Sequence, residues 1–170
     1  MTHPPHTANT LAAEWDRRYT DLAAHMPARD PNTVLLAEVG ALMPGRALDI
    51  GCGAGAEAIW LAQKGWQVTA LDVSHVALDR ASVRAREAAV HVEWVQGRLE
   101  DMEPDPRGFD LVVACYPALL KSEGRESERA LLAAVADGGT LLVVHHADID
   151  VDKAKSHKFD PADYLMHDDV

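Results

Sequence analysis

Three glycines at alternating positions are the residues of this chain best suited to hold a ligand. They are Gly51, Gly53 and Gly55. A short apolar run, 47–50, precedes them, and a second apolar run ends at Asp72. Glycines let backbone N–H groups approach a ligand closely, and the N-terminus of a following helix favours a negative group such as a carboxylate. Because an acidic residue at the next strand tip can hold both ribose hydroxyls, the pattern predicts a nucleotide-type cofactor site.

The glycine loop is open to two other interpretations. Gly51-x-Gly53-x-x-Ala56 fits a relaxed dinucleotide fingerprint, which would indicate an NAD-linked oxidoreductase. Asp49 argues against it, since a carboxylate there suits a cationic ammonium or sulfonium better than a pyrophosphate. Two helical segments also precede the first strand, whereas dinucleotide folds commonly begin near that strand. The other interpretation, a tight turn without a ligand, does not explain three close glycines.

The elements that must position these residues alternate between helix and strand. Helices are expected at 10–24, 31–43, 55–64, 74–89 and 127–136, and strands at 47–50, 67–71, 90–95, 109–114 and 140–144. This alternation predicts an α/β fold, a Rossmann-like doubly wound parallel sheet with helices on both faces. Ligands bind such sheets beyond the carboxyl ends of the strands. The sequence therefore predicts that the glycine loop, Asp72, residues 97–99 and residues 115–116 converge.

Two helix boundaries carry their own signals. Asp30 is the expected N-cap of the second helix, with Pro31 in its first turn. The run 137–139, Asp-Gly-Gly, is expected to end the last of these helices before the fifth strand. Ser74 is the expected cap of the helix that follows Asp72.

The length and composition indicate one domain with an ordinary globular core. The chain has 170 residues, 48% of them hydrophobic and 25% charged. We expect a single domain over 1–170, made of a mobile tail at 1–9, N-terminal helices at 10–44, a core at 45–146 and an incomplete C-terminal segment at 147–170.

The charge balance bears on the partners. The formal net charge of −11 disfavours nucleic acid, whose phosphates require a basic stripe. The densest basic cluster, Arg80, Arg84 and Arg86, is diluted by Asp79 and Glu87 and is interpreted as a solvated helix face. No apolar stretch approaches the roughly 20 residues of a membrane span, so no membrane partner is expected.

The two cysteines, Cys52 and Cys115, make a disulfide framework improbable and favour a cytoplasmic location. The first ten residues lack the basic patch and apolar segment of a signal peptide.

Four runs of the sequence resemble the motifs of one enzyme family, in the family's order. Ala47-Leu-Asp-Ile-Gly-Cys-Gly-Ala-Gly55 resembles the first motif of class I S-adenosylmethionine-dependent methyltransferases. The runs 68–74, 109–115 and 138–144 resemble later motifs. The resemblance implies the class I methyltransferase fold, S-adenosylmethionine as cofactor and S-adenosylhomocysteine as product.

A narrower resemblance concerns the N-terminal half. Trp15-Asp-Arg-Arg-Tyr19, Pro31-Asn32 and Ala58-Ile-Trp60-Leu-Ala resemble the small bacterial branch that contains tellurite-resistance and thiopurine-type methyltransferases.

The family resemblance assigns roles to residues of the cofactor site. It places Asp49 near the methionine ammonium, Asp72 on the ribose hydroxyls and Val73 against the adenine. It also implies cofactor contacts for the glycine loop (Gly51, Cys52, Gly53, Gly55), for the adenine edge (Gly97, Arg98, Leu99) and for the backbone carbonyl of Cys115. Related enzymes often have an acid where this chain has Arg98, so Glu100, Asp101 or backbone groups are the candidates for the adenine amino group.

Residues of the first helix have two interpretations each. Trp15 and Tyr19 are either the apolar stripe of the helix or a lid over the sulfonium, where a cation–π interaction contributes about 0.5–2 kcal/mol. Arg18 is either a contact of the methionine carboxylate or a surface charge.

The acceptor is expected to be a small molecule, such as a thiol, a chalcogen oxyanion or a similar metabolite. Residues 115–118 do not match the Asn/Asp-Pro-Pro-Tyr run of nucleobase amino methylases. A thiolate needs little beyond alignment, whereas a hydroxyl or amine can need a base, for which the candidates are Tyr19, Tyr116, His145 and His146. Tyr116, Leu119 and Leu120 are expected to form pocket wall.

Two further questions are whether the chain binds a metal and whether it is an enzyme. His145 and His146 with His157 lack the spacing of metal ligands, so no metal is expected. A cofactor-binding protein without turnover is the alternative to an enzyme.

The end of the sequence bears on assembly. Family members continue past a final helix into an antiparallel hairpin, which this sequence does not reach, so we expect the hairpin to be lacking. The fifth strand would then be an open edge. Either the chain is a shortened form or another subunit covers the edge, and the second possibility gives the hypothesis of a homodimer.

Overall fold

The computed structural model describes residues 8–23, 29–146 and 161–166. Its helices are α1 (Ala8–Ala23), α2 (Thr33–Val39), α3 (Ala56–Gln63), α4 (His75–Glu87) and α5 (Glu126–Ala134). Its strands are β1 (Arg46–Ile50), β2 (Gln67–Asp72), β3 (Glu93–Gln96), β4 (Phe109–Cys115) and β5 (Val135–Val144). Two 3₁₀ turns, Leu99–Asp101 and Pro161–Asp163, complete the described elements.

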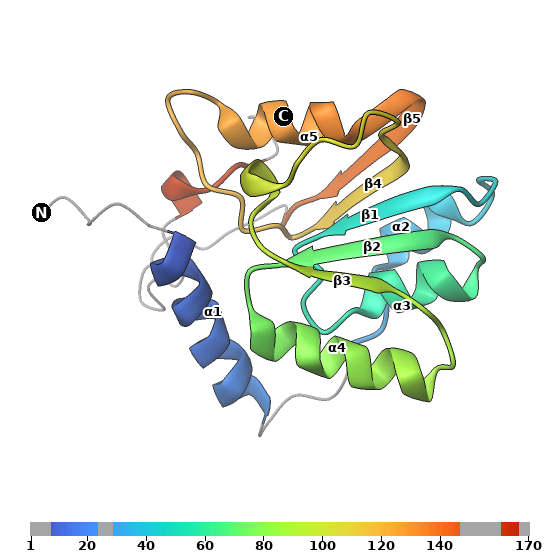
Figure 1. The fold of residues 1–170 in the computed structure, drawn as a ribbon, viewed down its shortest axis with the longest axis horizontal. Helices are drawn as coiled ribbons and strands as arrows, with labels where there is room; N and C mark the ends of the chain where they lie inside the picture. The colour runs from blue at the N-terminus through green and yellow to red at the C-terminus, as the bar shows by residue number, and fades with distance from the viewer. Residues whose placement is uncertain (1–7, 24–28, 147–160, 167–170) are drawn as a thin grey trace, which may run out of the picture.

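The strands form one parallel sheet in the order β3-β2-β1-β4-β5. Figure 1 shows α5 on one face of the sheet and α2, α3 and α4 on the other. The predicted Rossmann-like α/β fold is therefore confirmed. The chain moves outward from β1 to β3 and then returns to β4, so the strand order switches between β1 and β4. Ligands of open α/β sheets bind at the carboxyl ends of the strands beside such a switch.

Alternate side chains along β1 pack on opposite faces of the sheet. Ala47 packs in the buried cluster under α2, α3 and α4, whereas Leu48 and Ile50 pack in the cluster under α5. All three are at most 2% exposed, as expected for a central parallel strand covered on both sides. Both faces thus hold β1 rigidly behind the glycine loop.

The start of α2 differs from the prediction. Its N-cap is Asn32 and not Asp30, so the helix begins at Thr33. Asn32 Oδ1 accepts a hydrogen bond from Val34 N at 2.9 Å, while its own N–H donates to Glu57 Oε1 at 3.0 Å. Asn is as good an N-cap as Asp, so the local preference does not decide between Asn32 and Asp30. The bond from Asn32 N–H to Glu57 of α3 places the cap at Asn32. The prediction missed that tertiary contact.

The junction of α5 and β5 also corrects a prediction. Residues 137–139 do not end the helix, because α5 ends at Ala134 and β5 starts at once. The register steps from Phe109↔Val135 to Leu111↔Thr140, so the strand carries an irregularity here. Gly138 has φ +76°, a conformation that glycine adopts without strain. The Asp-Gly-Gly run therefore marks a bulge within the strand.

The C-terminal stretch 161–166 contributes to the core, which the sequence did not signal. Leu165 is 1% exposed within the cluster under α5, and its N–H donates to Leu119 O at 2.8 Å. Tyr164 forms an isolated antiparallel bridge with Leu120. Leu119 is itself buried in that cluster, and its place in a pocket wall stays a prediction.

Candidate functional site

The glycine loop is fixed by backbone bonds to the neighbouring strand. Gly51 N and Cys52 N both donate to Leu71 O, at 2.8 and 3.0 Å. Gly51, Gly53 and Gly55 all have positive φ, at +66°, +52° and +79°. A Cβ on Gly55 would lie 2.9 Å from Ala81 Cβ, so this glycine also lets α3 and α4 pack closely. The loop is thus a rigid backbone cradle at the carboxyl end of β1.

Asp72 lies at the tip of β2 with its carboxylate turned to this loop. Oδ2 accepts from Gly53 N and Oδ1 from Ser74 N, each at 2.8 Å. The side chain is 7% exposed. Burial raises its pKa above the usual value, although the bonds from Ser74 and Gly53 oppose that shift. Because each carboxylate oxygen has two lone pairs, Asp72 keeps acceptor capacity for a further donor.

Asp49 is a buried carboxylate on the α3 side of β1. It is 1% exposed, and Oδ2 has no hydrogen-bond partner among the residues that the structure describes. Burial raises its pKa well above the usual value, and repulsion from Glu57 and Asp72 adds to this, although a bond from Ala58 N–H opposes it. An unpartnered buried acceptor of this kind is costly unless a donor or cation completes it.

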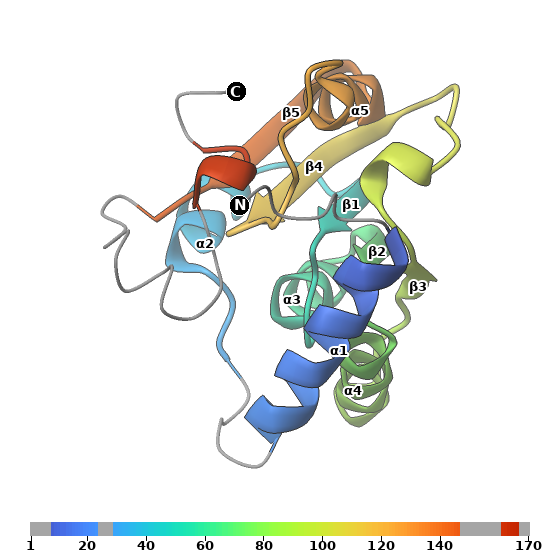
Figure 2. The same ribbon diagram turned by 90° about the vertical axis from the view of Figure 1, so that its left-hand side faces the viewer.

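Helix α1 lies across the carboxyl ends of the strands, beside α4 (Figure 2). It brings the Tyr19 hydroxyl against Gly53, where a Cβ on the glycine would overlap it. Burial raises the pKa of Tyr19, and the charge of Asp72 adds to the shift, so the hydroxyl is protonated at neutral pH. The structure therefore places Tyr19 at the glycine loop but not in the form of a base.

Trp15 and Arg18 interact with each other on the same helix. The Arg18 guanidinium lies 4.9 Å from the centre of the Trp15 ring, and Arg18 also pairs with Glu14 at 2.9 Å. The Trp15 and Tyr19 ring centres are 6.2 Å apart. The cation on the Trp15 ring in this structure is therefore Arg18.

The contact between Tyr19 and Gly53 gives a first prediction. Gly53→Ala should lower the free energy of unfolding by about 1–2 kcal/mol, because alanine is strained at φ +52° and its methyl group overlaps the Tyr19 hydroxyl. The loss should be smaller in a Tyr19→Phe background, where the overlap is gone. Urea denaturation of the four variants measures this coupling, and equal losses in both backgrounds would contradict it.

The segment after β3 reaches the same edge of the sheet. Gly97 N donates to Asp72 O at 3.0 Å, and Gln96 Nε2 donates to Val73 O at 3.3 Å. Leu99 is buried in the cluster under α5. Arg98 turns to Glu100, with Nε 3.3 Å from Oε2.

Glu100 is also the partner of another element, since it accepts a hydrogen bond from the Ser127 hydroxyl of α5. Of the two acids considered for the adenine amino group, Glu100 is therefore engaged elsewhere, while Asp101 is exposed.

The ends of β4 and β5 bring Tyr116 and His146 together. Their rings stack at 4.2 Å with an angle of 14° between planes. Tyr116 has φ +55°, rare for a residue with a Cβ, and its N–H donates to Val144 O at 2.8 Å. The next residue, Pro117, has its Cα 3.9 Å from the Cβ position of Gly51. Strained backbone of this kind concentrates at functional sites, and here it directs an aromatic pair beside the glycine loop.

The two cysteines are protonated thiols. Burial raises the pKa of Cys52 well above its usual value, and it raises that of Cys115 to about 12. At neutral pH both side chains are therefore thiols and not thiolate nucleophiles.

The histidines form no metal site in the part of the chain that the structure describes, where no group of three or more His, Cys, Asp or Glu could hold an ion. His145 and His146 lie at the carboxyl end of β5, and His157 lies outside the described residues.

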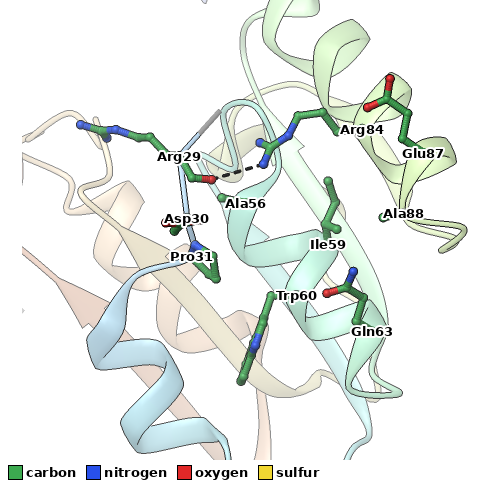
Figure 3. A pocket seen from close by; sticks show the side chains of 10 residues that line it. All are labelled: Arg29, Asp30, Pro31, Ala56, Ile59, Trp60, Gln63, Arg84, Glu87 and Ala88. Atoms are coloured by element: carbon green, nitrogen blue, oxygen red, sulfur yellow. Dashed lines mark hydrogen bonds between the residues drawn. The ribbon is translucent and has the colours of Figure 1, made fainter. Parts of the chain in front are cut away.

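A hollow of about 390 Å³ lies away from this edge, between the outer faces of α3 and α4 (Figure 3). Trp60 and Gln63 border it from α3, and Arg84 borders it from α4. Arg84 is more than the solvated charge that we predicted, because it donates to Ala54 O of the glycine loop at 2.7 Å and to Arg29 O at 3.2 Å. This hollow thus lies behind the glycine loop and contains none of the predicted site residues.

Comparison with known proteins identifies the family. A model of the methyltransferase domain family matches residues 47–139, which span β1 to the start of β5. The chain belongs to this family. The predicted class I methyltransferase resemblance is confirmed, while the narrower resemblance to the tellurite-resistance and thiopurine branch stays a prediction.

Individual relatives share parts of the sequence and the fold. A ubiquinone biosynthesis O-methyltransferase of Yersinia pestis (strain Pestoides F) is 36% identical over 86 residues, which cover 50% of this chain and 35% of that protein. The [4+2]-cyclase SpnF has a TM-score of 0.68 at 26% identity, over 85% of this methyltransferase-family chain and 64% of the cyclase. The DhpI–SAH complex has a TM-score of 0.55 at 26% identity, over 85% of this chain and 68% of that one. The chain thus spans about a third of the curated relative's length.

Proposed function

We propose that this methyltransferase-family chain binds S-adenosylmethionine and transfers its methyl group to a small-molecule acceptor. The observation that carries the proposal is the buried, unpartnered Asp49 carboxylate beside a glycine cradle and Asp72. Clustered carboxylates suit a cofactor that carries an ammonium and a sulfonium, and they would repel a pyrophosphate. The match of the DhpI–SAH complex supports the same ligand class.

The proposed roles follow the positions of the side chains. Asp72 accepts hydrogen bonds from the ribose hydroxyls with its remaining lone pairs. Asp49 attracts the methionine ammonium from beneath the loop. The backbone of the glycine loop packs closely against the cofactor on the loop's exposed side. Val73 and residues 97–99 border the adenine, and the Cys115 carbonyl faces the ammonium.

The reaction that we propose is an in-line displacement. When bound, the cofactor supplies an electrophilic methyl group on a sulfonium. The chain aligns the acceptor with the S–CH₃ bond, and such alignment can supply several kcal/mol of the barrier. Tyr116 and His146 are positioned to form part of the acceptor wall, and His145 or His146 is the candidate base, since Tyr19 remains protonated.

The acceptor that we propose is a thiol, a chalcogen oxyanion or a similar metabolite. The acidic balance of the chain supports a small molecule over nucleic acid. The name of the Yersinia relative, an O-methyltransferase of ubiquinone biosynthesis, adds small hydroxylated aromatics to the acceptors worth testing.

Turnover tests this proposal directly. Protein incubated with S-adenosylmethionine and a panel of thiols, tellurite and small phenols should form S-adenosylhomocysteine with at least one acceptor. Binding of the cofactor without product for the whole panel would favour the alternative of a cofactor-binding protein without methyl transfer. The likeness to SpnF favours this second candidate, because SpnF is described as a cyclase and not as a methyltransferase.

We further propose that the chain forms a single domain and that it is located in the cytoplasm. We also propose that it forms a homodimer by pairing β5 with β5 of a second copy. Among the described residues no strand pairs with the outer edge of β5, and partly exposed Leu142 and Val143 lie along it. Two free cysteines support a reducing compartment. No helix of the described residues is long and apolar enough to cross a membrane.

The pairing has a simple expected result. Light scattering at micromolar concentration should give twice the chain mass of 18.5 kDa. A wild-type monomer would contradict the pairing.

A further inference from the structure

Asp16 joins α1 to the first turn of α4 through both of its carboxylate oxygens. Oδ1 accepts a hydrogen bond from the Ser74 hydroxyl at 2.7 Å and a longer one from Val76 N at 3.3 Å. Oδ2 lies 2.7 Å from His75 Nδ1. Three consecutive residues at the start of α4, Ser74 to Val76, therefore contact one side chain of α1, about sixty residues earlier in the sequence.

Ser74 extends this contact into the cofactor site. It is fully buried, and its hydroxyl also caps α4 by accepting from Ala77 N at 3.1 Å. Its own N–H donates to Asp72 Oδ1, and Asp72 Oδ2 accepts from Gly53 N. A continuous series of hydrogen bonds thus runs from Asp16 through Ser74 and Asp72 to the glycine loop.

The same helix reaches the loop a second time. Tyr19 follows Asp16 by three residues, so the two side chains lie on neighbouring positions of one helix face. The Tyr19 hydroxyl lies against Gly53, the residue at the far end of the hydrogen-bond series. The carboxylate of Asp16 also lies at the positive end of the α4 dipole, which stabilises the charge there. Helix α1 is therefore held at the glycine loop in two ways, by the contact of Tyr19 with Gly53 and by the bonds of Asp16 to the start of α4.

We propose that Asp16 is a positioning residue that latches α1 over the glycine loop and so sets the affinity for the cofactor without touching it. The effect on affinity rests on the proposed function, whereas the latch between α1 and α4 does not. The two parts can therefore be measured separately.

Hydrogen exchange and calorimetry on the same variants test both parts. In Asp16→Ala, amide exchange in α1 should be at least tenfold faster while β1 and β2 keep wild-type protection, and the Kd for S-adenosylhomocysteine should rise about tenfold. Asp16→Asn should recover most of both properties, because its amide oxygen still accepts from Ser74 and Val76. Asp21→Ala, which removes an exposed carboxylate from the same helix, is the matched control and should leave both unchanged.

A double-mutant cycle with Ser74→Ala shows whether the latch acts through Ser74. The affinity lost on Ser74→Ala should be smaller in the Asp16→Ala background than in wild type, since the shared bond is then already absent. Additive losses would show that Asp16 does not act through Ser74.

The outcomes separate the latch from the proposed function. Wild-type exchange in α1 of Asp16→Ala would overturn the latch, and faster exchange with an unchanged Kd would overturn its effect on the cofactor. If the wild-type protein does not bind S-adenosylhomocysteine, the proposed function fails instead, and the exchange data alone decide whether Asp16 holds α1 to α4.

Discussion

Asp72→Ala should lower the affinity for S-adenosylhomocysteine by about a hundredfold. Two hydrogen bonds between a carboxylate and the ribose hydroxyls contribute roughly 3 kcal/mol together, taking about 1.5 kcal/mol for each charged bond. The substitution also removes the acceptors of Gly53 N and Ser74 N, while the bonds of Gly51 N and Cys52 N to Leu71 O keep the loop on β2. Isothermal titration calorimetry measures the change.

The control for this variant is Asp79→Ala. Asp79 is an exposed carboxylate of α4, so its removal changes the net charge equally without touching the loop. Thermal unfolding of both variants separates lost binding from lost folding. An unchanged affinity of folded Asp72→Ala would show that the ribose does not lie at Asp72.

Asp49→Asn should act in opposite directions on stability and on binding. Because burial raises the folded-state pKa of Asp49 above its unfolded value, the stability that this group contributes is fully present below the unfolded pKa and is lost as the pH rises through the folded pKa. At neutral pH an uncharged amide also removes repulsion from Glu57 and Asp72. The variant should therefore gain about 1–2 kcal/mol, or roughly 2–8 °C in Tm.

The pH dependence checks this sign. The Tm advantage of Asp49→Asn should be largest near pH 8 and should shrink as the pH falls through the raised folded-state pKa, because the wild-type carboxyl then takes up its proton. Affinity for S-adenosylhomocysteine should fall about tenfold at pH 8, because the amide no longer attracts the ammonium. Asp79→Asn should change neither property. A less stable Asp49→Asn at every pH would mean that the Asp49 carboxylate is satisfied in the folded protein.

Much of the fold follows from local patterns. The apolar runs before Gly51 and Asp72 became β1 and β2, and Ser74 became the predicted cap of α4. Where the sequence misled, a distant partner decided the outcome. Glu57 selected Asn32 as the cap of α2, and pairing with β4 extended β5 back through residues 137–139. Such contacts leave no local signal in a single sequence.

The candidate site was predictable where backbone geometry defines it and not where side chains meet across elements. The spacing of the glycines and the position of Asp72 predicted their convergence, which the hydrogen bond between Gly53 N and Asp72 confirms. The role of Asp16 was missed, since an acid on a polar helix face is ordinary. Only the approach of α1 to α4 reveals its bonds to Ser74 and His75.

Calorimetric titration of S-adenosylhomocysteine into the wild-type protein, with NADH as the control ligand, tests the central claim most directly. The account predicts a single site of micromolar Kd for S-adenosylhomocysteine and no heat of binding for NADH. Binding of NADH alone, or of neither ligand, would contradict the assignment of the glycine loop, Asp49 and Asp72 to an S-adenosylmethionine site.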